Sequence, residues 1–466
     1  MDIETDYLIV GAGATGLAFA DSLLAEADVD VVLVDRRSLP GGHWRDAYPF
    51  VRLHTPSAYY GVNSMPLGRD QVIESGRNEG FYEQAGAAEI RAYFESVVEH
   101  LASTGRARFL ARHDHLGGGG SDHRVRDLDS EDIHTISVRR RMVDARYLEG
   151  SIPATHQPSF TVAPDAAFVP VNDLPDSVDG HRRYTVIGGG KTSADACLWL
   201  LDNDVSPDQI RWVRPRDSWF ADRAYLQPLD QVAALMEGIS FDTEAAALAR
   251  DLSDLFDRLE DRGRLMRLDP RVSPTMYRGT MLSRRELTDL REIENVVRLG
   301  RLRAIEADRI VLHDGELPTS AEVLHVDCSA IGLSDAAPVP VFSPSRIVIQ
   351  QVRRESPTFN AALLAFVEAH RDDDEERNRL SPPHPYTSRT EDWGPLMHRT
   401  WSTELTWFQE PDVTAWIAAS RLNVLRALPE HANEPRAREA VDRYLKYVGP
   451  AIERLGAAHR TGHDTM

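Results

Sequence analysis

The sequence predicts an α/β fold with two Rossmann-like domains, one inserted in the other, followed by a helical C-terminal extension. Two glycine-rich segments carry this prediction, one beginning at Gly11 and one at Gly188, and each follows a short apolar run. Each is followed by the apolar periodicity of a helix, so both are typical of a strand, a tight turn and a helix. Beyond residue 371, amphipathic patterns surround several tryptophans and predict further helices.

The first glycine-rich segment predicts a binding site for the pyrophosphate of a dinucleotide. Gly11 permits the tight turn, Gly13 lets the backbone approach a phosphate, and Gly16 lets the helix pack on the strand. The next apolar run ends in Asp35, at the spacing of a carboxylate that accepts hydrogen bonds from a ribose, with Arg36 beside it. The site suits the adenosine of FAD or NAD. The alternative is a strand, turn and helix with a structural role alone.

The second glycine-rich segment predicts a second nucleotide. Its candidate contacts lie in the loop and the first helical turn, and they are Gly188, Gly190, Lys191, Thr192 and Ser193. The apolar run 210–213 then ends in Arg214 and Arg216, where the first unit has an acid. Because guanidinium groups pair with a ribose 2′-phosphate, we expect NADPH rather than NADH here. The alternative is that both arginines are solvated surface residues.

Composition excludes several classes of function. The chain of 466 residues has a formal net charge of -20, which argues against nucleic acid or an anionic membrane as a partner. No apolar stretch approaches the ~18 residues of a membrane span, and the first residues are acidic, so we expect a cytoplasmic protein without a membrane partner. The two cysteines, Cys197 and Cys328, form no CxxC motif, which argues against a disulfide reductase.

The order of the segments predicts a discontinuous first domain. Residues 1–160 and 326–370 form it, and residues 161–325 form the second nucleotide-binding domain with a helical insertion. Residues 371–466 form the helical extension, which either covers the active site or makes a homodimer contact.

Histidine and glycine are concentrated between His113 and His123. The four consecutive glycines 117–120 predict the tip of a surface hairpin, and we expect no metal site in this segment or elsewhere.

The segments that follow the first ribose-binding acid resemble those of the class B flavin-dependent monooxygenases. The chain has Gly41-Gly42-His43-Trp44, then Tyr48-Pro49 and Arg52-Leu53-His54-Thr55-Pro56-Ser57, and its second glycine motif is also similar to theirs. The resemblance covers residues 5–70 and 184–220 well and the rest in layout alone. It implies an FAD-binding domain with an inserted NADPH-binding domain, and it places Gly42, His43 and Trp44 at the FAD.

Two departures from the family pattern bear on the activity. The FxGxxxH fingerprint expected before the second glycine motif is absent, since residues 168–175 read FVPVNDLP. The ATG-type linker is replaced by residues 143–147, VDARY. The fold and the cofactors are compatible with these changes, whereas oxygen transfer is less directly supported.

The resemblance places the loop from Arg52 to Asn63 against the flavin ring. Its candidate catalytic residues are Arg52, His54, Thr55 and Asn63, with Ser57 as a further polar side chain. The alternative is that His54 and Asn63 cap turns. In two-domain flavoproteins a late helix often directs its N-terminus at the flavin, so we expect the helix after Ser356 and Pro357 to place Thr358, Phe359 and Asn360 at the ring.

These features predict an FAD- and NADPH-dependent oxidoreductase. The first candidate is a monooxygenase that uses dioxygen and a C4a-peroxyflavin to oxygenate a small organic substrate. The second is an NADPH-dependent FAD reductase or dehydrogenase without oxygen transfer, which the missing fingerprint favours. A flavoprotein without catalytic activity is the third. The sequence does not identify the substrate.

Overall fold

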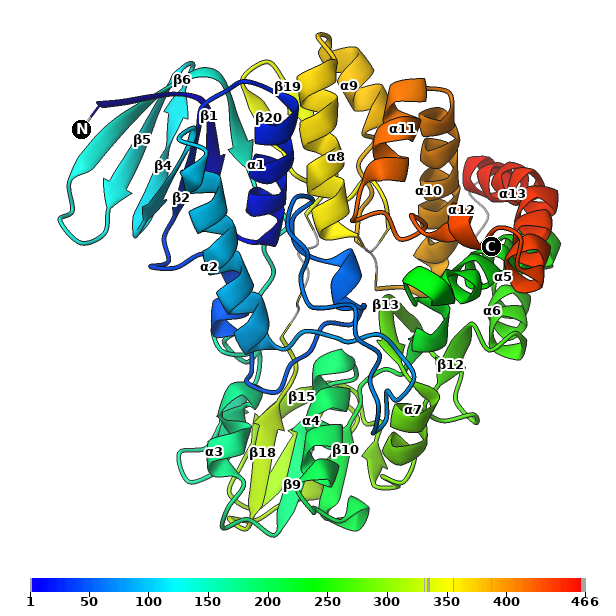
Figure 1. The fold of residues 1–466 in the computed structure, drawn as a ribbon. Coiled ribbons are helices and arrows are strands. Elements are labelled where there is room, and N and C mark those ends of the chain that lie inside the picture. The colour runs from blue at the N-terminus through cyan, green and yellow to red at the C-terminus, as the bar shows by residue number, and fades with distance from the viewer. Residues whose placement is uncertain (1, 331, 333–335, 355, 387, 462–466) are drawn as a thin grey trace.

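The computed structural model describes residues 2–330, 332, 336–354, 356–386 and 388–461, and it contains two sheets of mainly parallel strands that carry helices (Figure 1). In the first sheet the main path has the order β19-β20-β6-β1-β2-β3, and β4 and β5 extend it from β6. Its strands are β1 (Asp2–Val10), β2 (Val31–Asp35), β3 (Ala107–Ala111), β4 (His113–Gly119), β5 (Asp122–Asp127), β6 (Ile133–Asp144), β19 (Phe342–Ser343) and β20 (Arg346–Val348).

The centre of the first sheet is formed by the apolar runs that the sequence shows. β1 pairs in parallel with β2 and with β6, and every residue of β2 is buried, as expected for a strand covered on both faces. Helix α1 (Ala14–Glu26) packs on α8 (Pro357–His370) beside this sheet, and α2 (Ala87–Ser103) lies next to α1 (Figure 1). The late segment thus returns to the first domain.

The second sheet is fully parallel and has the order β14-β10-β9-β18-β8. Its strands are β8 (Phe168–Pro170), β9 (Arg183–Ile187), β10 (Ile210–Val213), β14 (Val296–Val297) and β18 (Val323–Asp327). The accompanying helices are α3 (Leu174–Ser177), α4 (Lys191–Asp202) and α7 (Arg284–Leu290). Because β18 continues to Asp327, the second sheet extends past the boundary expected at residue 325.

Two smaller sheets flank the second domain. One has the order β17-β16-β15-β7 and the other β12-β11-β13. Their strands are β7 (Thr161–Val162), β11 (Ser218–Asp222), β12 (Leu265–Arg267), β13 (Met276–Leu282), β15 (Leu302–Ile305), β16 (Arg309–Leu312) and β17 (Gly315–Pro318). The inserted helices are α5 (Val232–Leu248) and α6 (Leu252–Asp261).

The C-terminal extension is helical, as predicted, and it packs on the inserted helices. Its helices are α9 (Asp374–Leu380), α10 (Trp393–Phe408), α11 (Pro411–Ala419), α12 (Leu428–His431) and α13 (Pro435–Thr461). Helix α13 contacts α5 (Figure 1). Trp393 and Trp401 of α10 share one apolar cluster with Trp219 of β11 and Phe256 of α6. No helix in the described part of the chain is long and apolar enough to cross a membrane.

Candidate functional site

The first glycine-rich loop requires glycine at Gly11 and Gly16, whereas Gly13 has space beside it. Gly11 has φ +105°, and a Cβ on Gly16 would lie 2.0 Å from the carbonyl oxygen of Gly11, so strand and helix approach as closely as the motif predicts. Gly13 is the N-cap of α1 and has no side-chain cap, and a Cβ built on it would lie 3.5 Å from the Cα of Gly42. The first N–H groups of α1 are therefore available to a phosphate, and the loop fits a dinucleotide pyrophosphate.

Asp35 lies beside this loop at the end of β2. Its Oδ2 accepts a hydrogen bond from the backbone N–H of Ala12 at 2.8 Å, and its Oδ1 accepts one from the N–H of Arg37 at 2.8 Å. A carboxylate oxygen has two lone pairs, so each oxygen retains an acceptor position. The side chain is held in place and can still receive a ribose hydroxyl.

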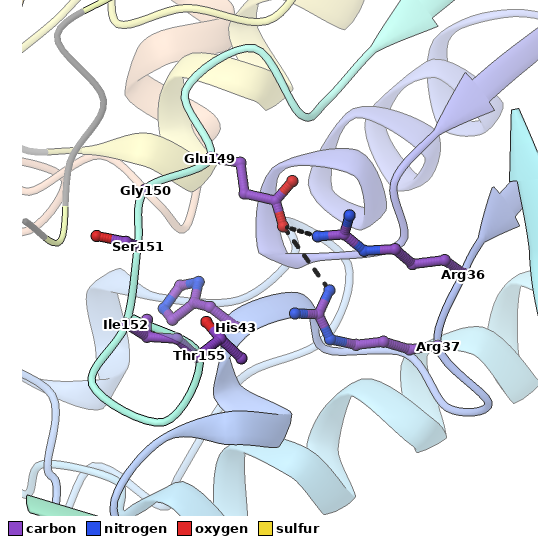
Figure 2. Close-up of a pocket in the computed structure, with 8 residues that line it drawn as sticks. All are labelled: Arg36, Arg37, His43, Glu149, Gly150, Ser151, Ile152 and Thr155. Atoms are coloured by element: carbon purple, nitrogen blue, oxygen red, sulfur yellow. Dashed lines mark hydrogen bonds and ion pairs between the residues drawn. The ribbon is translucent and has the colours of Figure 1, made fainter. Parts of the chain in front are cut away.

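A pocket of about 560 Å³ opens beside Arg36 and Arg37, the two residues that follow Asp35 in the chain (Figure 2). The residues that line it are Arg36, Arg37, His43, Glu149, Gly150, Ser151, Ile152 and Thr155. Arg36 lies 2.5 Å and Arg37 3.9 Å from the Glu149 carboxylate. Arg36 and His43, predicted from separate motifs, thus meet at one pocket. Trp44 instead turns into the core and donates from Nε1 to the Tyr60 hydroxyl at 2.8 Å.

In the second glycine-rich loop, Gly190 is the glycine at which an added side chain would meet no neighbouring atom of the described residues. A Cβ on Gly188 would lie 2.7 Å from the Cys328 carbonyl oxygen, and a Cβ on Gly189 would lie 2.6 Å from that of Arg216. A Cβ on Gly190 would meet nothing within 4 Å, and α4 begins at the next residue. Gly190 is therefore where a ligand can approach the backbone. The Ser193 hydroxyl is buried and donates to the Gly190 carbonyl at 2.8 Å, so it supports the loop from inside.

The two arginines predicted to bind a 2′-phosphate have different environments. Arg214 is 3% exposed, and its guanidinium lies 4.7 Å from the ring centroid of Trp212 and 3.4 Å from Asp217. Arg216 is exposed, and its backbone borders Gly189. Arg214 therefore packs inside the domain, and Arg216 alone of the pair is open to a ligand.

A loop of the first domain docks on helix α4 of the second. The Tyr48 hydroxyl donates to Asp195 at 2.7 Å, and Phe50 stacks on Trp199 with 5.4 Å between ring centroids. Asp195 also forms an ion pair with Lys191, the first residue of α4. The N-terminus of α4 and the loop that contains His54 therefore meet at the junction of the two domains.

His54 lies at this junction among charged groups. Burial, together with the positive charges of Lys191 and Arg223, lowers the pKa of His54 to about 3. Arg223 donates to the His54 carbonyl at 2.7 Å and to Glu286 at 2.9 Å. At neutral pH His54 is an uncharged imidazole, with one nitrogen that donates and one that accepts.

The other predicted catalytic residues are not gathered around His54. Thr55 follows it and is half-buried, but Arg52 is exposed and donates to the Gln84 carbonyl at 3.0 Å. Asn63 accepts hydrogen bonds from the Ser420 hydroxyl and the Arg421 N–H, both at 3.0 Å. The interpretation of Asn63 as a residue that stabilises a turn fits this structure better than a catalytic one.

The start of α8 is also engaged within the protein. Asn360 accepts from the N–H of Arg353 at 2.8 Å and donates to its carbonyl at 2.9 Å. Phe359 is fully buried, with ring centroids 6.4 Å from Trp407 and 6.1 Å from Trp416, and Thr358 is 1% exposed. These contacts give Phe359 and Asn360 a packing role that the sequence pattern did not indicate.

Arg421, in the C-terminal extension, holds the predicted catalytic loop. Its guanidinium donates to the carbonyls of Ala58 at 2.7 Å, Tyr60 at 2.8 Å and Val62 at 2.6 Å. The sequence predicts that the extension either covers the active site or makes a homodimer contact. This contact favours a role at the site, where the extension supports the predicted catalytic loop. No local pattern in the sequence links Arg421 to a loop that lies 359 residues away, so this contact could not be predicted.

Replacement of Arg421 with methionine is expected to lower the free energy of unfolding by about 1.5–3 kcal/mol, because three carbonyls lose a charged donor. Hydrogen exchange of residues 58–63 should accelerate in the same variant. Arg426→Met, at an exposed arginine of the same segment, is the control and should change neither quantity. Unchanged exchange in Arg421→Met would show that the loop is held by other contacts.

Comparison with known proteins supports the first nucleotide-binding unit. Residues 9–66 match the NAD(P)-binding Rossmann-like domain family. The uncharacterized protein Rv2000 of Mycobacterium tuberculosis is 43% identical over 457 residues, which cover 97% of this chain and 84% of that protein. The chain belongs to the Rv2000 family. A further family member, Mb2023 of Mycobacterium bovis, has the same identity and coverage.

This member of the Rv2000 family shares its fold with a monooxygenase of known structure. The polycyclic ketone monooxygenase of Thermothelomyces thermophila superposes with a TM-score of 0.52 and 13% identity, covering 97% of this chain and 88% of that one. The probable FAD-binding monooxygenase AlmA of Acinetobacter is 30% identical over 100 residues, 21% of this chain and 18% of that protein. The predicted α/β dinucleotide-binding fold and the likeness to class B monooxygenases are thus confirmed at the level of fold.

Proposed function

We propose that the protein is an FAD- and NADPH-dependent monooxygenase that oxidises a small organic substrate with dioxygen. The observation that carries the proposal is the junction of the domains, where the first-domain loop docks on α4 through Tyr48 and Asp195, and Arg223 binds the carbonyl of His54. A flavin and a nicotinamide bound in the two domains could meet at this junction for hydride transfer. The likeness of 100 residues to a probable FAD-binding monooxygenase supports the choice of oxygen as the acceptor.

The residues of the first domain fit FAD. The first turn of α1 would bind the pyrophosphate, Asp35 the ribose, and the pocket at Arg36 and His43 the adenine end. The flavin would supply the redox chemistry with oxygen. In the second domain the open backbone of Gly190 and the exposed Arg216 would bind the phosphates of NADPH.

The protein groups at the junction would control protons and water. An uncharged His54 can donate a hydrogen bond to a substrate oxygen, or accept one from it when that oxygen carries a proton, without placing a charge at the junction. Lys191 is held by Asp195, and that carboxylate is held by Tyr48, so the ammonium has a fixed position. The aromatic contact of Phe50 with Trp199 closes the junction on one side.

The experiment that tests the function is rapid mixing of the purified holoprotein. The flavin is reduced anaerobically with NADPH and then mixed with oxygenated buffer, and oxygen consumption is followed together with the flavin spectrum. A delay between oxygen consumption and return of the oxidised flavin spectrum supports the monooxygenase. Immediate return, with faster turnover on a quinone than on oxygen, supports the alternative of a reductase, which the absent FxGxxxH fingerprint favours.

Arg216→Ala is expected to raise the KM for NADPH by about 10- to 100-fold and to leave the KM for NADH unchanged, because a charged hydrogen bond to the 2′-phosphate contributes about 1.5–3 kcal/mol. Steady-state kinetics with both nucleotides measure this. Arg301→Ala, at another exposed arginine of the second domain, should behave as wild type. Equal changes for NADPH and NADH in Arg216→Ala would exclude a role in recognising the 2′-phosphate.

A further inference from the structure

Three strands of the first domain bring two histidines and an aspartate together. His113 lies on β4, Asp127 at the end of β5 and His134 on β6, and one potential ligand atom from each lies within 4.8 Å of the others. His113 is the direct cross-strand partner of Asp127, and His134 pairs with Val125, two positions before Asp127. Because side chains alternate along a strand, these positions share one face of the sheet. In Figure 1, β4 and β5 lie at the edge of the first domain.

A hydrogen bond determines which nitrogen of His113 carries the proton and which can bind a cation. Nδ1 lies 2.7 Å from the carbonyl oxygen of Ala111, and since a carbonyl only accepts, this nitrogen carries the proton. The Nε2 atom then has its lone pair available, in the tautomer common among metal-bound histidines. The ring stacks on that of His134, with 5.9 Å between centroids and 28° between planes.

The carboxylate of Asp127 is oriented and charged. It accepts hydrogen bonds from the backbone N–H of Asp129 at 2.8 Å and of Ser130 at 3.4 Å. All three candidate ligands are half-buried, so a cation can reach them from solvent.

The surrounding charges are mixed, with an acidic loop next to the cluster. The loop after β5 contains Asp129, Glu131 and Asp132, while Arg112 pairs with Asp129 at 2.9 Å and Arg126 lies 3.6 Å from Glu131. The two arginines are thus engaged by acids of the loop, which leaves the Asp127 carboxylate to face the two imidazoles.

We propose that His113, Asp127 and His134 form a binding site for a divalent transition-metal ion of the Zn²⁺ type. Two imidazoles and one carboxylate are a common three-ligand set for Zn²⁺, and a water molecule completes the coordination. Mg²⁺ and Ca²⁺, which prefer oxygen ligands, do not suit this set. The sequence predicted no metal site at the His-rich segment, because that segment supplies only His113 and the other two ligands lie on different strands.

Zinc binding by the full-length, tag-free protein tests this site. After removal of metal with EDTA, the protein is dialysed against buffered micromolar Zn²⁺, and bound zinc is measured by mass spectrometry. We expect about one zinc per chain, displaced by Cu²⁺ and unaffected by Mg²⁺. Asp127→Asn and His134→Gln should each weaken binding at least ~10-fold, as loss of one ligand removes a large part of the affinity.

His313→Gln is the matched control, because His313 also lies beside an aspartate in a surface hairpin, with Nδ1 2.6 Å from Asp314. It should bind zinc as wild type does. A second measurement needs no variant: Zn²⁺ should protect His113 and His134 of the wild type from diethylpyrocarbonate. Less than about a tenth of an equivalent of zinc, or equal zinc in all folded variants, or no protection, would overturn the proposal.

Discussion

Gly13→Ala is expected to yield a folded protein that purifies with less than about a tenth of the wild-type flavin content, because the dinucleotide approaches the backbone where the new methyl group would stand. Gly13 has φ −82° and ψ −174°, a conformation that alanine adopts without strain. The added Cβ would be 3.5 Å from the Cα of Gly42, an ordinary contact within the protein. The loss therefore concerns the ligand and not the fold.

Gly86→Ala provides the matched control for this variant. Gly86 is the N-cap of α2, with φ −86° and ψ 169° and no side-chain cap, so its backbone closely resembles that of Gly13. Both variants should lose the same small amount of helix stability, but only Gly13→Ala should lose flavin. Flavin content by absorbance and thermal unfolding measure the two effects. Normal flavin content in Gly13→Ala would mean that the pyrophosphate does not lie at this loop.

Arg223→Met is expected to lower the free energy of unfolding by about 3–5 kcal/mol, because it leaves the carboxylate of Glu286 buried without its partner. Arg223 is 1% exposed and lies 2.9 Å from Glu286. It also donates to the carbonyl of His54, so the docking of the first-domain loop should loosen. Denaturant unfolding measures the first effect, and hydrogen exchange at residues 53–57 the second.

The double variant Arg223→Met/Glu286→Gln separates the charge from the packing. It should recover much of the stability lost in Arg223→Met, since no buried charge remains. No recovery would falsify the electrostatic explanation. Glu286→Gln alone, with the arginine left unpaired, completes the cycle.

The ion pair of Arg223 and Glu286 makes the free energy of unfolding depend on pH. Although burial raises the pKa of Glu286, the charges of Arg223 and Lys191 outweigh it and lower the pKa to about 2. A carboxyl group whose pKa is lower in the folded state stabilises the protein above its unfolded pKa, and this stability is lost as the pH falls through the folded value. In Arg223→Met the main cause of the lowering is removed, so the stability deficit relative to wild type should shrink as the pH falls from 4.5 toward 2.

The elements of the fold that the sequence predicted are those with local causes. The glycine loops, the strand before each and the helix after each follow from the residues in one short segment, and the position of Asp35 at the end of the next strand follows from its spacing. Ser283 and Glu286 have the spacing of a capping box, and the structure contains it at the start of α7. Such a pattern identifies a helix start, but it does not show that Glu286 also pairs with Arg223.

What could not be predicted depends on contacts between distant segments. Whether Arg214 faces solvent or Trp212 depends on the side-chain rotamer and on Asp217, and a basic pair in the sequence fits either case. Asn63 is a candidate catalytic residue when only its own loop is considered, but its side chain accepts a hydrogen bond from the C-terminal extension, 357 residues away. Phe359 was expected at a ligand, and it packs against tryptophans whose positions no local pattern specifies.

The close approach of Gly189 to Arg216 restricts substitutions at position 189 but not at position 216. Any side chain at position 189 would displace the carbonyl of residue 216, since a Cβ there would lie 2.6 Å from it. The side chain at 216, in contrast, projects from a fixed backbone into solvent. If Arg216 binds the 2′-phosphate as proposed, a single substitution at 216 would change the preferred nucleotide and leave the domain intact, whereas any side chain at 189 would disturb this turn.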